Sequence, residues 1–462
     1  MSAPVDTPKS VRIAFAAGTL RVEGLPRAAG VELPAACRWD ERERVHRLPA
    51  IDYAELILKL RAQKVPYEDE ARAYSELSRA PAVKHEPFVY QREALQAWER
   101  ARFRGVVVLP TGTGKTFLAT LAIASRKRST LVVVPTLDLV NQWYDGLSAA
   151  FGEPIGIVGG GYHEVEDITV TTYDSAYLHM ERLGSRFGLV VFDEYHHLPS
   201  ASYSLGAKMC LAPFRLGLSA TPERTDERGY DDTIGPIVFR RDITELAGEY
   251  LAAYDVQRLA VPLSADERAQ YEAARDVYRS FLRANQIRMS ERDGWQRFLL
   301  LSSQSDAGRR AFLAYREQKK LALAAPGKLA VLGKLLHAHR RDRTIVFTED
   351  NATVYQIARQ FLVPAITHQT KVKERSFLLS SFNEGALTAI VTSKVLNEGV
   401  NVPEANVAIV LSGNASVREH VQRLGRILRK TGDKLATMYE LVAAGTAEEY
   451  TSERRREHVA YQ

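Results

Sequence analysis

Short apolar runs, each followed by a stretch with helical spacing, recur through most of the chain. After Gly105 these runs read VVVLP, TLVVVP, ITVTT, LVVFDE and LGLSAT, and after Pro326 they read TIVFTED, VPAITH, LTAIVTS, NVAIVLS and TMYELV. An alternation of strands and helices predicts a parallel sheet with helices on both faces, whose ligands bind at the carboxyl ends of the strands. The pattern therefore predicts two α/β domains.

Two segments depart from this alternation. Residues 1 to about 80 mix alternating stretches such as VRIAFAAGTLRVEG with one predicted helix, Asp52 to Gln63. From about Glu245 to Lys320 strand signals vanish, and the sequence becomes charged and helical. Aromatic residues are interleaved along this second segment, namely Tyr271, Tyr278, Phe281, Trp295 and Phe298. We predict a small mixed N-terminal module at 1–80, an α/β domain at 81–244, a helical insertion at 245–325 and a second α/β domain at 326–462.

Composition and charge narrow the class of protein only slightly. At 462 residues the chain can hold about three domains, and its 45% hydrophobic and 26% charged residues are ordinary for a soluble globular protein. No apolar run approaches the ~18–20 residues that span a bilayer, so we expect no membrane segment. The two cysteines fit a reducing cytoplasm. A net charge of +6 hints at a polyanionic partner.

The strongest signal for chemistry is LPTGTGKT, Leu109 to Thr116, which follows a predicted strand and precedes the helical stretch FLATLAIA. Backbone N–H groups of such a loop bind phosphates at a helix N-terminus, where the dipole also favours negative charge. Lys115 would reach the β and γ phosphates of ATP, and the Thr116 hydroxyl would hold Mg²⁺. The other loop residues expected at the nucleotide are Thr111, Gly112, Thr113 and Gly114. Leu109 replaces the first glycine of the strict GxxxxGK[ST] pattern. A glycine-rich turn without a ligand is the alternative, which the strand–loop–helix context disfavours.

A second polar cluster ends the apolar run LVVFDEYHH, Leu189 to His197. It could be a metal site, a catalytic carboxylate pair or only the polar end of a buried strand. Adjacent Asp and Glu residues on a strand point to opposite faces, which disfavours a zinc site. A P-loop ATPase needs a second strand end with a carboxylate for Mg²⁺. We therefore expect Asp193 to hold Mg²⁺, Glu194 to orient or deprotonate the attacking water, and His196 to couple hydrolysis to other events.

The order of motifs between about Tyr90 and Val442 resembles that of superfamily 2 helicases of the DExH group. YQREAL resembles the Q motif, VVVPTLDLVNQW motif Ia, TTYDSA motif Ib, LSATP motif III, IVFTED motif IV, TSKVLNEGVNVP motif V and QRLGRILR motif VI. The resemblance implies that Gln91 reads the adenine edge and that Gly399 lies at the nucleotide. It also implies nucleic-acid backbone contacts at Pro135, Thr136, Thr172 and Ser393, coupling through Ser219 and Thr221, and γ-phosphate contacts from Gln422 and the arginine fingers Arg426 and Arg429. A positioned guanidinium can stabilise the negative charge of a transferring phosphoryl group.

Within the superfamily, DEYHHLPS, the single insertion and the long stretch VLNEGVNVPEANVAIVLSGNASVREHVQRLGRILRK resemble the XPB helicases, most closely the compact archaeal and bacterial forms. This resemblance implies an N-terminal damage-recognition domain and a thumb-like insertion. It also implies an Arg-Glu-Asp element after motif III that takes part in opening DNA. Arg224, Thr225 and Asp226 stand in that place here, with threonine for the central acid, and this departure bears on the strength of duplex opening.

These observations predict an α/β protein with two RecA-like parallel-sheet motor domains, a helical insertion and a small mixed N-terminal domain. We expect an ATP-dependent, Mg²⁺-using DNA helicase or translocase, 3′ to 5′ by resemblance, that acts on single strands and forked duplexes in excision-repair-type opening. A nuclease of the repair pathway is the expected protein partner, and the expected location is the cytoplasm, at the nucleoid. Two other readings stay open: a duplex translocase of the type III restriction kind, and an ATP-gated damage-binding protein that recruits a nuclease and unwinds little. RNA also stays open as a substrate, because phosphate contacts hardly distinguish the sugars.

Overall fold

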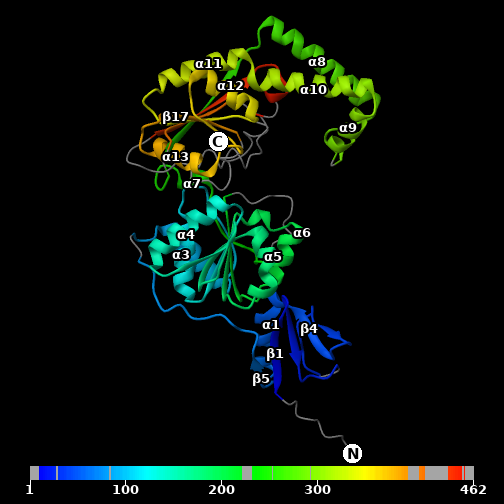
Figure 1. Cartoon of the computed structure of the whole chain (residues 1–462), viewed down its shortest axis with the longest axis vertical. Helices are drawn as coiled ribbons and strands as arrows, with labels where there is room; N and C mark the ends of the chain where they lie inside the picture. Colours follow the sequence, from blue (N-terminus) through cyan, green and yellow to red (C-terminus); the bar gives the residue numbers. More distant parts are fainter. Residues whose placement is uncertain are drawn as a thin grey trace, which may run out of the picture. The chain divides into compact units, whose positions relative to one another are not determined.

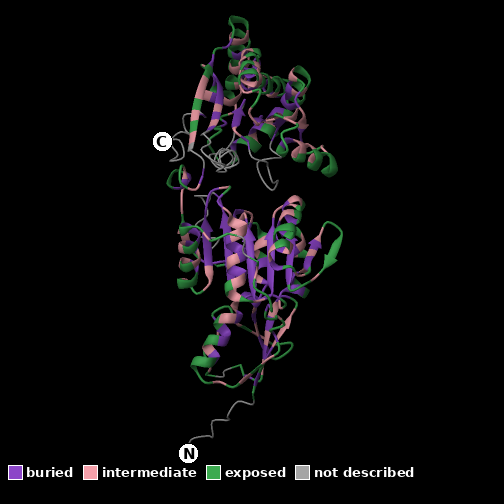
Figure 2. Ribbon diagram, turned by 90° about the vertical axis from the view of Figure 1, so that its left-hand side faces the viewer, coloured by how far each residue is buried: buried purple, intermediate pink, exposed green. Residues whose placement is uncertain are grey.

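The protein folds as two compact units, residues 1–241 and residues 242–462 (Figure 1). The computed structural model describes residues 10–27, 30–82, 85–220, 232–251, 253–291, 293–393, 405–411, 435–449 and 452. Figure 2 shows that the strands of the larger sheets are buried, whereas the covering helices expose their outer faces.

The first unit begins with a five-stranded mixed sheet in the order β3-β4-β2-β1-β5. Its strands are β1 (Val11–Ala16), β2 (Thr19–Glu23), β3 (Arg38–Asp40), β4 (Val45–Pro49) and β5 (Tyr67–Asp69), of which β5 alone among these pairs parallel to its neighbour. The short 3-10 turn η1 (Ala50–Asp52) leads into helix α1 (Tyr53–Ala62), which confirms the predicted helix. Alternate residues of β1 and β2, such as Ile13 and Leu20, are fully buried, as the alternating sequence requires.

The apolar core of this N-terminal module extends into the next domain. Leu211, which follows the first domain's helix α6 (Ala201–Lys208), is fully buried in the cluster formed by the module's own apolar residues. Gly18, in the β1–β2 turn, has φ +76°, and a Cβ built there would lie 2.4 Å from Cγ of Met209. The Ala73 N–H donates to the Ser185 carbonyl at 3.1 Å. The module and the domain therefore share one core.

The first α/β domain is built on an eight-stranded sheet in the order β13-β6-β12-β11-β7-β10-β8-β9, parallel except for the β8–β9 pair. The strands are β6 (Arg104–Val108), β7 (Thr130–Val134), β8 (Ile155–Gly159), β9 (Tyr162–Glu164), β10 (Ile168–Thr172), β11 (Leu189–Asp193), β12 (Phe214–Ser219) and β13 (Ile237–Arg240). The helices are α2 (Val89–Arg100), α3 (Lys115–Arg126), α4 (Leu137–Phe151), α5 (Tyr173–Leu183) and α6, with a 3-10 turn η2 (Tyr195–His197). In Figure 1, α3 and α4 lie on one side of the sheet and α5 and α6 on the other. The predicted strands are confirmed, and β8, β9 and β13 are additions.

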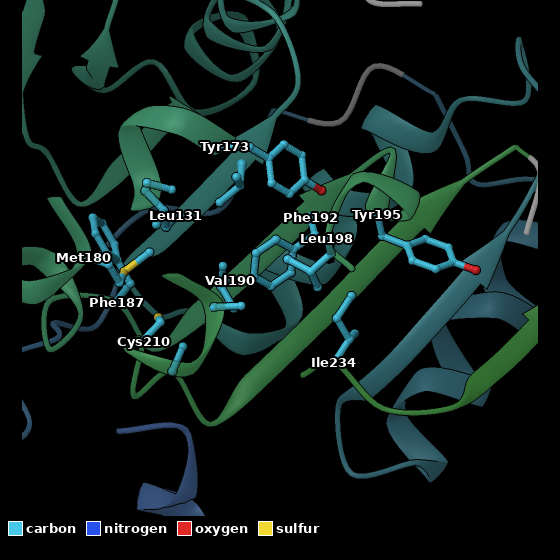
Figure 3. Packing of buried hydrophobic residues seen from close by; sticks show 14 of the residues in the cluster. Leu131, Tyr173, Met180, Phe187, Val190, Phe192, Tyr195, Leu198, Cys210 and Ile234 are labelled. Carbon is cyan, nitrogen blue, oxygen red and sulfur yellow. The ribbon is translucent and has the colours of Figure 1, made fainter. Parts of the chain in front are cut away.

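Strand residues and α5 form the core on one face of this sheet. Figure 3 shows Leu131, Val190 and Phe192 from the strands close to Tyr173 and Met180 of α5. A charged residue lies at the amino end of β12, where Arg215 is fully buried. Its guanidinium donates to the carbonyls of Ala207, Ala212, Cys210 and Thr233, the last at 2.9 Å. Burial lowers the pKa of Arg215 to about 10.

The second unit contains a six-stranded sheet in the order β14-β19-β18-β15-β17-β16, and the strand pairs that the structure describes there are parallel. Its strands are β14 (Ala253–Val261), β15 (Thr344–Phe347), β16 (Ala365–Ile366), β17 (Ala389–Thr392), β18 (Val407–Val410) and β19 (Leu435–Ala443). Its helices outside the insertion are α7 (Ile243–Leu246), α11 (Pro326–Ala338), α12 (Asn351–Phe361) and α13 (Val372–Asn383). The prediction that strand signals vanish from about 245 to 320 is wrong for β14. This strand lies at the sheet edge, so exposed polar residues such as Asp255 and Gln257 interrupt its apolar pattern.

The insertion consists of helices α8 (Ala265–Ala284), α9 (Gly294–Ser303) and α10 (Asp306–Ala324), as its helical sequence predicts. Most of its interleaved aromatics gather in a small core, in which Tyr278, Phe281 and Tyr315 pack around the fully buried Phe298, while Tyr271 lies in a separate cluster at the base. Its base is tied to the segment after β19. The Ala447 N–H donates to the Tyr271 hydroxyl at 2.9 Å, and Arg268 donates to the Ala444 carbonyl at 2.8 Å.

A buried ion pair lies in the same region of the second unit. Lys328, at the start of α11, is fully buried, and its Nζ lies 2.5 Å from Oε2 of Glu448, which is 6% exposed. The same ammonium donates to the Leu411 carbonyl at 3.0 Å, and the same carboxylate oxygen accepts from the Ala443 N–H at 2.9 Å. The pair therefore joins the first turn of α11 to the ends of β18 and β19.

One run in the described part of the chain, Asp306–Ala338, is long and apolar enough to cross a membrane by length and composition alone, which the sequence did not predict. It comprises two helices, α10 and α11, separated at Ala325. Leu329 and Leu332 of α11 lie in the core of the second sheet. Core helices pass the same length and composition test, and we assign α11 to the core.

Candidate active site

The loop from Leu109 to Thr116 connects the carboxyl end of β6 to the first turn of α3, as the sequence predicts. Gly112 and Gly114 have φ values of +87° and +78°, a backbone conformation that glycine adopts without strain. The Thr113 hydroxyl donates to the Pro110 carbonyl at 2.7 Å and closes the loop on itself. The loop thus leads directly into the N-terminus of α3, the arrangement of an anion-binding site.

Two side chains of helix α2 donate hydrogen bonds to this loop. The Tyr90 hydroxyl and the Gln91 side-chain amide both donate to the Thr113 carbonyl, at 2.6 and 3.0 Å. The Gln91 Oε1 accepts from the Phe88 N–H at 3.0 Å, so both ends of this buried amide are engaged within the protein. The structure therefore places Gln91 as a support of the phosphate loop. Its predicted contact with adenine stays a prediction.

Lys115 and Asp193 approach each other at the carboxyl edge of the sheet. The Lys115 ammonium donates to the Leu109 carbonyl at 3.2 Å. Asp193 ends β11 and is 7% exposed. Burial and the neighbouring Glu194 carboxylate raise the pKa of Asp193 to about 6, while the Lys115 charge and the hydrogen bond from Trp143 act in the opposite direction. The sheet order thus brings together two motifs that are 78 positions apart in sequence.

Two hydrogen bonds orient the Asp193 carboxylate. The Glu194 N–H donates to Oδ1 at 3.0 Å, and the Trp143 indole N–H donates to Oδ2 at 2.9 Å. A third bond holds the backbone, where the Tyr173 hydroxyl donates to the Asp193 carbonyl at 2.9 Å. Neither Trp143 nor Tyr173 was predicted as a site residue.

Glu194 forms a compact group with the residues expected to couple hydrolysis to other events. Its φ of +47° turns the chain out of β11 and into η2. Glu194 Oε2 lies 3.4 Å from Nδ1 of His196 and 3.5 Å from Oγ of Ser219, and the His196 nitrogen lies 3.3 Å from the same hydroxyl. Ser219 ends β12, and its carbonyl accepts from the Leu109 N–H at 2.9 Å. The phosphate loop, Glu194 and His196 therefore meet at the end of β12.

The residues present fit a magnesium–nucleotide complex. Thr116 in the first turn of α3 and Asp193 provide a hydroxyl and a carboxylate, the hard oxygen ligands that Mg²⁺ prefers. A cavity of about 370 Å³ adjoins the loop and is lined by Gly114, Thr116 and Phe117, together with His85 and residues of α4. Among the described residues, no group of three or more His, Cys, Asp and Glu side chains is placed to hold a metal. Nucleotide phosphates and water would therefore supply the remaining ligands of a metal ion at this site.

The predicted nucleic-acid contacts of the first domain lie at the same edge of the sheet. Pro135 and Thr136 follow β7, and the Thr136 hydroxyl caps α4 by accepting from the Leu139 N–H at 3.4 Å. Thr172 ends β10 and caps α5 by accepting from the Ser175 N–H at 3.2 Å. Both hydroxyls thus act as helix caps in this structure, while the strand ends that carry them lie side by side because β7 pairs with β10.

A glycine run that was not predicted as part of the site lies beside these strand ends. Gly159, Gly160 and Gly161 all have positive φ and connect β8 to β9. A Cβ at Gly160 would lie 3.0 Å from Leu137 of α4, and one at Gly159 would lie 2.9 Å from Oγ of Ser175. The triplet GGG is the signal that could have marked this close backbone approach.

The remaining predicted residues divide into one that the structure describes and several that it does not. Ser393 follows β17 in the second unit, and its hydroxyl donates to Oδ1 of Asn351 at 2.7 Å. The others lie outside the described residues: Thr221, Arg224, Asp226, Gly399, Gln422, Arg426 and Arg429.

Comparison with known families finds three matches along the chain. Residues 13–71 match the Xeroderma pigmentosum group B helicase damage recognition domain, residues 84–224 the type III restriction enzyme res subunit, and residues 309–462 the ERCC3/RAD25/XPB C-terminal helicase. The second match covers the phosphate loop and the Asp193–Glu194 pair, and the third covers the second sheet from β15 onward.

The chain is similar to XPB proteins of several organisms. The DNA 3'-5' translocase XPB2 of Sulfurisphaera tokodaii is 42% identical over 80% of this chain and 84% of its own length. The DNA 3'-5' helicase XPB of Kineococcus radiotolerans is 31% identical over 79% of this chain and 62% of its own length. The XPB/SSL2 subunit of general transcription and DNA repair factor IIH in Saccharomyces cerevisiae is 25% identical over 90% of this chain. Apart from the first relative, the chain spans about half to six-tenths of the length of these proteins.

Two solved structures share the fold. The Pyrococcus furiosus Hef helicase domain matches 80% of this chain with a TM-score of 0.54 at 18% identity. The structure of S. cerevisiae Dbp5 bound to RNA and ADP BeF3 matches 82% with a TM-score of 0.58 at 13% identity. The likeness confirms the predicted architecture of two RecA-like domains, each described above as a parallel sheet with covering helices.

Proposed function

Because the chain belongs to the XPB family of superfamily 2 helicases, we propose that it is an ATP-dependent DNA helicase or translocase that moves 3′ to 5′ and opens DNA during repair. The observation that carries this proposal is the meeting of Lys115, Asp193 and Glu194 at one edge of the first parallel sheet. ATP hydrolysis needs a phosphate-binding lysine, a carboxylate for the metal and a group that orients water, and these three residues supply them.

In this mechanism, the loop from Leu109 to Thr116 binds the β and γ phosphates through backbone N–H groups and Lys115. Bound Mg²⁺ would neutralise developing charge on the phosphates and would be held by Thr116 and Asp193. Glu194 lies next to this site and accepts the proton of the attacking water or orients that water. Its contacts with His196 and Ser219 restrain the carboxylate, and they connect it to the end of β12, where motif III begins.

The nucleic-acid strand would contact the edge formed by the starts of α4 and α5 and by the loop from Gly159 to Gly161. Backbone N–H groups at helix starts and in glycine turns suit phosphate oxygens, so binding would be largely independent of base sequence. The match of residues 13–71 to a damage recognition domain supports a role of the N-terminal module in finding damaged DNA. By family resemblance alone, we also propose a repair nuclease as partner and a cytoplasmic location at the nucleoid.

Two alternatives have a specific observation in their favour. The match of residues 84–224 to the type III restriction res subunit favours a duplex translocase that separates no strands. Thr225, in place of the central acid expected after motif III, favours a damage-binding protein that unwinds little. Both alternatives retain DNA-stimulated ATP hydrolysis, so hydrolysis alone does not distinguish them from a helicase.

The deciding experiment combines hydrolysis with strand displacement. ATP turnover should rise with single-stranded DNA and less with RNA, and a duplex with a 3′ tail should be opened in preference to one with a 5′ tail. Glu194→Gln serves as the control, because it should bind ATP and DNA while hydrolysis nearly stops. DNA-stimulated hydrolysis without displacement of either duplex would overturn the helicase proposal and leave the alternatives. If DNA did not stimulate ATP hydrolysis, the helicase proposal and both alternatives would be overturned.

A further inference from the structure

Two buried aromatic side chains connect Asp193 to the helices that begin at the proposed strand-binding edge. Trp143 belongs to α4, which starts at its cap Thr136, and Tyr173 is the first residue of α5, which starts at its cap Thr172. The Trp143 side chain is fully buried and Tyr173 is 3% exposed. Trp143 donates to the Asp193 carboxylate and Tyr173 to the Asp193 carbonyl, each at 2.9 Å.

The paths from the proposed nucleic-acid contacts to Asp193 are short. Trp143 lies seven residues into α4 after Thr136, a rise of about 10 Å along the helix at 1.5 Å per residue. Tyr173 immediately follows Thr172, and its ring stacks beside Phe192, the residue before Asp193, with centroids 6.3 Å apart (Figure 3). Each helix is therefore connected to Asp193 by a hydrogen bond from one of its side chains.

The two bonds constrain different parts of Asp193. The indole N–H donates to one oxygen of the carboxylate and the Glu194 N–H donates to the other. An ionised carboxylate has about four lone-pair sites, so each oxygen retains one lone pair for another ligand. A buried indole N–H bonded to a carboxylate sets the rotation of that carboxylate, in the way that a second ligand shell orients the groups bound to a metal. The tyrosine hydroxyl restrains the end of β11 from which the side chain projects.

We propose that Trp143 and Tyr173 are positioning residues that orient Asp193 toward the magnesium–nucleotide complex and connect this orientation to strand binding at the starts of α4 and α5. The proposal rests on the proposed function, since it assumes a hydrolysing site at Asp193. It assigns a role to motif Ia and Ib segments beyond contact with the nucleic-acid backbone. It also explains why an indole, the one aromatic side chain with a ring N–H donor and no acceptor, suits position 143.

A simpler explanation is that a buried indole N–H needs a partner and that Asp193 is the nearest acceptor. The chain offers a matched control for this reading. Trp98 of α2 is 1% exposed, and its indole N–H donates to the Arg215 carbonyl at 2.8 Å, at the amino end of β12 and away from the catalytic edge. Trp98→Phe and Trp143→Phe delete the same donor from equally buried rings, but only one of these donors reaches Asp193.

The test measures binding of a fluorescent ATP analogue by the full chain while MgCl₂ is varied, together with hydrolysis with and without single-stranded DNA. In Trp143→Phe the Mg²⁺ concentration for half-maximal binding should rise about 10- to 100-fold, the range found when second-shell partners of metal ligands are lost. Binding of the analogue without Mg²⁺ should stay unchanged. Tyr173→Phe should keep the Mg²⁺ requirement closer to that of the wild type and lower the stimulation of hydrolysis by DNA. Trp98→Phe should alter neither quantity.

Equal Mg²⁺ requirements in Trp143→Phe and Trp98→Phe would overturn the role of Trp143, and unchanged DNA stimulation in Tyr173→Phe would overturn the coupling role. If Trp143→Phe does not fold, Trp143→His can be tested instead, because histidine also has a ring N–H donor. A Mg²⁺ requirement in Trp143→His equal to that of the wild type would support the positioning role of Trp143. A His variant that folds but shows the raised requirement speaks against it. A wild-type protein that binds the analogue with Mg²⁺ but hydrolyses no ATP would refute the proposed function, while the Mg²⁺ titration would still decide the positioning role.

Discussion

Replacing Lys328 with methionine should strongly destabilise the second unit. The ammonium is fully buried 2.5 Å from Glu448 and also donates to the Leu411 carbonyl, so its removal leaves a buried carboxylate without this cation and a buried carbonyl without this donor. Removing one partner of a buried ion pair costs about 3–5 kcal/mol. For a unit of about 220 residues, each kcal/mol lowers Tm by about 2–4 °C, which gives a decrease of roughly 6–20 °C.

A double variant tests the same ion pair in a second way. Lys328→Met combined with Glu448→Met replaces both charges by side chains of similar length, and such replacements are often neutral or stabilising by about 1–4 kcal/mol. The double variant should therefore be more stable than Lys328→Met alone. Lys334→Met, on the exposed face of the same helix, is the matched control and should shift Tm little.

Calorimetry of the full chain would measure these shifts. Hydrogen exchange of peptides from α11 and β19 would assign them to the second unit. A Lys328→Met variant no less stable than Lys334→Met would refute the view that the pair is a buried, mutually dependent contact. A double variant less stable than either single variant would refute the view that the cost arises from the uncompensated charge.

Three further predictions concern the motor. Lys115→Ala should weaken ATP binding itself, because the β and γ phosphate contact is lost, and unchanged nucleotide affinity in a binding titration would contradict the phosphate-loop assignment. Arg426→Ala and Arg429→Ala should each lower kcat by on the order of 10³-fold with little change in ATP affinity, because arginine fingers act on transition-state charge; a defect confined to affinity would place them in ground-state binding. Deleting the insertion helices 265–324 should preserve basal ATP hydrolysis and weaken DNA binding, with a log–log salt slope shallower by about 0.7–0.9 per lost phosphate contact. An unchanged slope in a folded deletion variant would make the insertion a structural spacer.

The sequence predicted the elements whose apolar runs are fully buried. β6, β7 and β11 carry continuous apolar runs, and β10 and β12 are equally buried, because both faces of a parallel sheet are covered. It missed β8 and β9, which meet at a glycine run, and the edge strands β13 and β14, which carry exposed residues. Fully buried Arg215 could not be predicted either, because its four carbonyl acceptors come from segments that only the fold assembles.

The chemistry of the candidate site was predictable for a different reason. The phosphate loop is a local motif in which each residue acts near its own position, so Gly112, Gly114 and Lys115 could be identified from spacing alone. The contact of Trp143 with Asp193 spans 50 positions and depends on the order of β7 and β11 in the sheet. Gln91 was predictable only in part. Its motif could be recognised in the sequence, but its hydrogen bonds with the Phe88 N–H and the Thr113 carbonyl depend on the fold.

The shared core of the N-terminal module and the first domain affects how the module can be studied. A truncated protein that starts near residue 81 would lose the apolar partners of Leu211 and expose a side chain that is now fully buried, along with Met209. Such a truncation would be prone to aggregate, and a loss of repair activity in it would not distinguish missing damage recognition from a damaged motor. Surface substitutions on the module that retain Gly18 and Leu211 would test damage recognition without disturbing the shared core. In evolution, the same contact would make the module difficult to lose or to exchange between relatives without matching changes after α6.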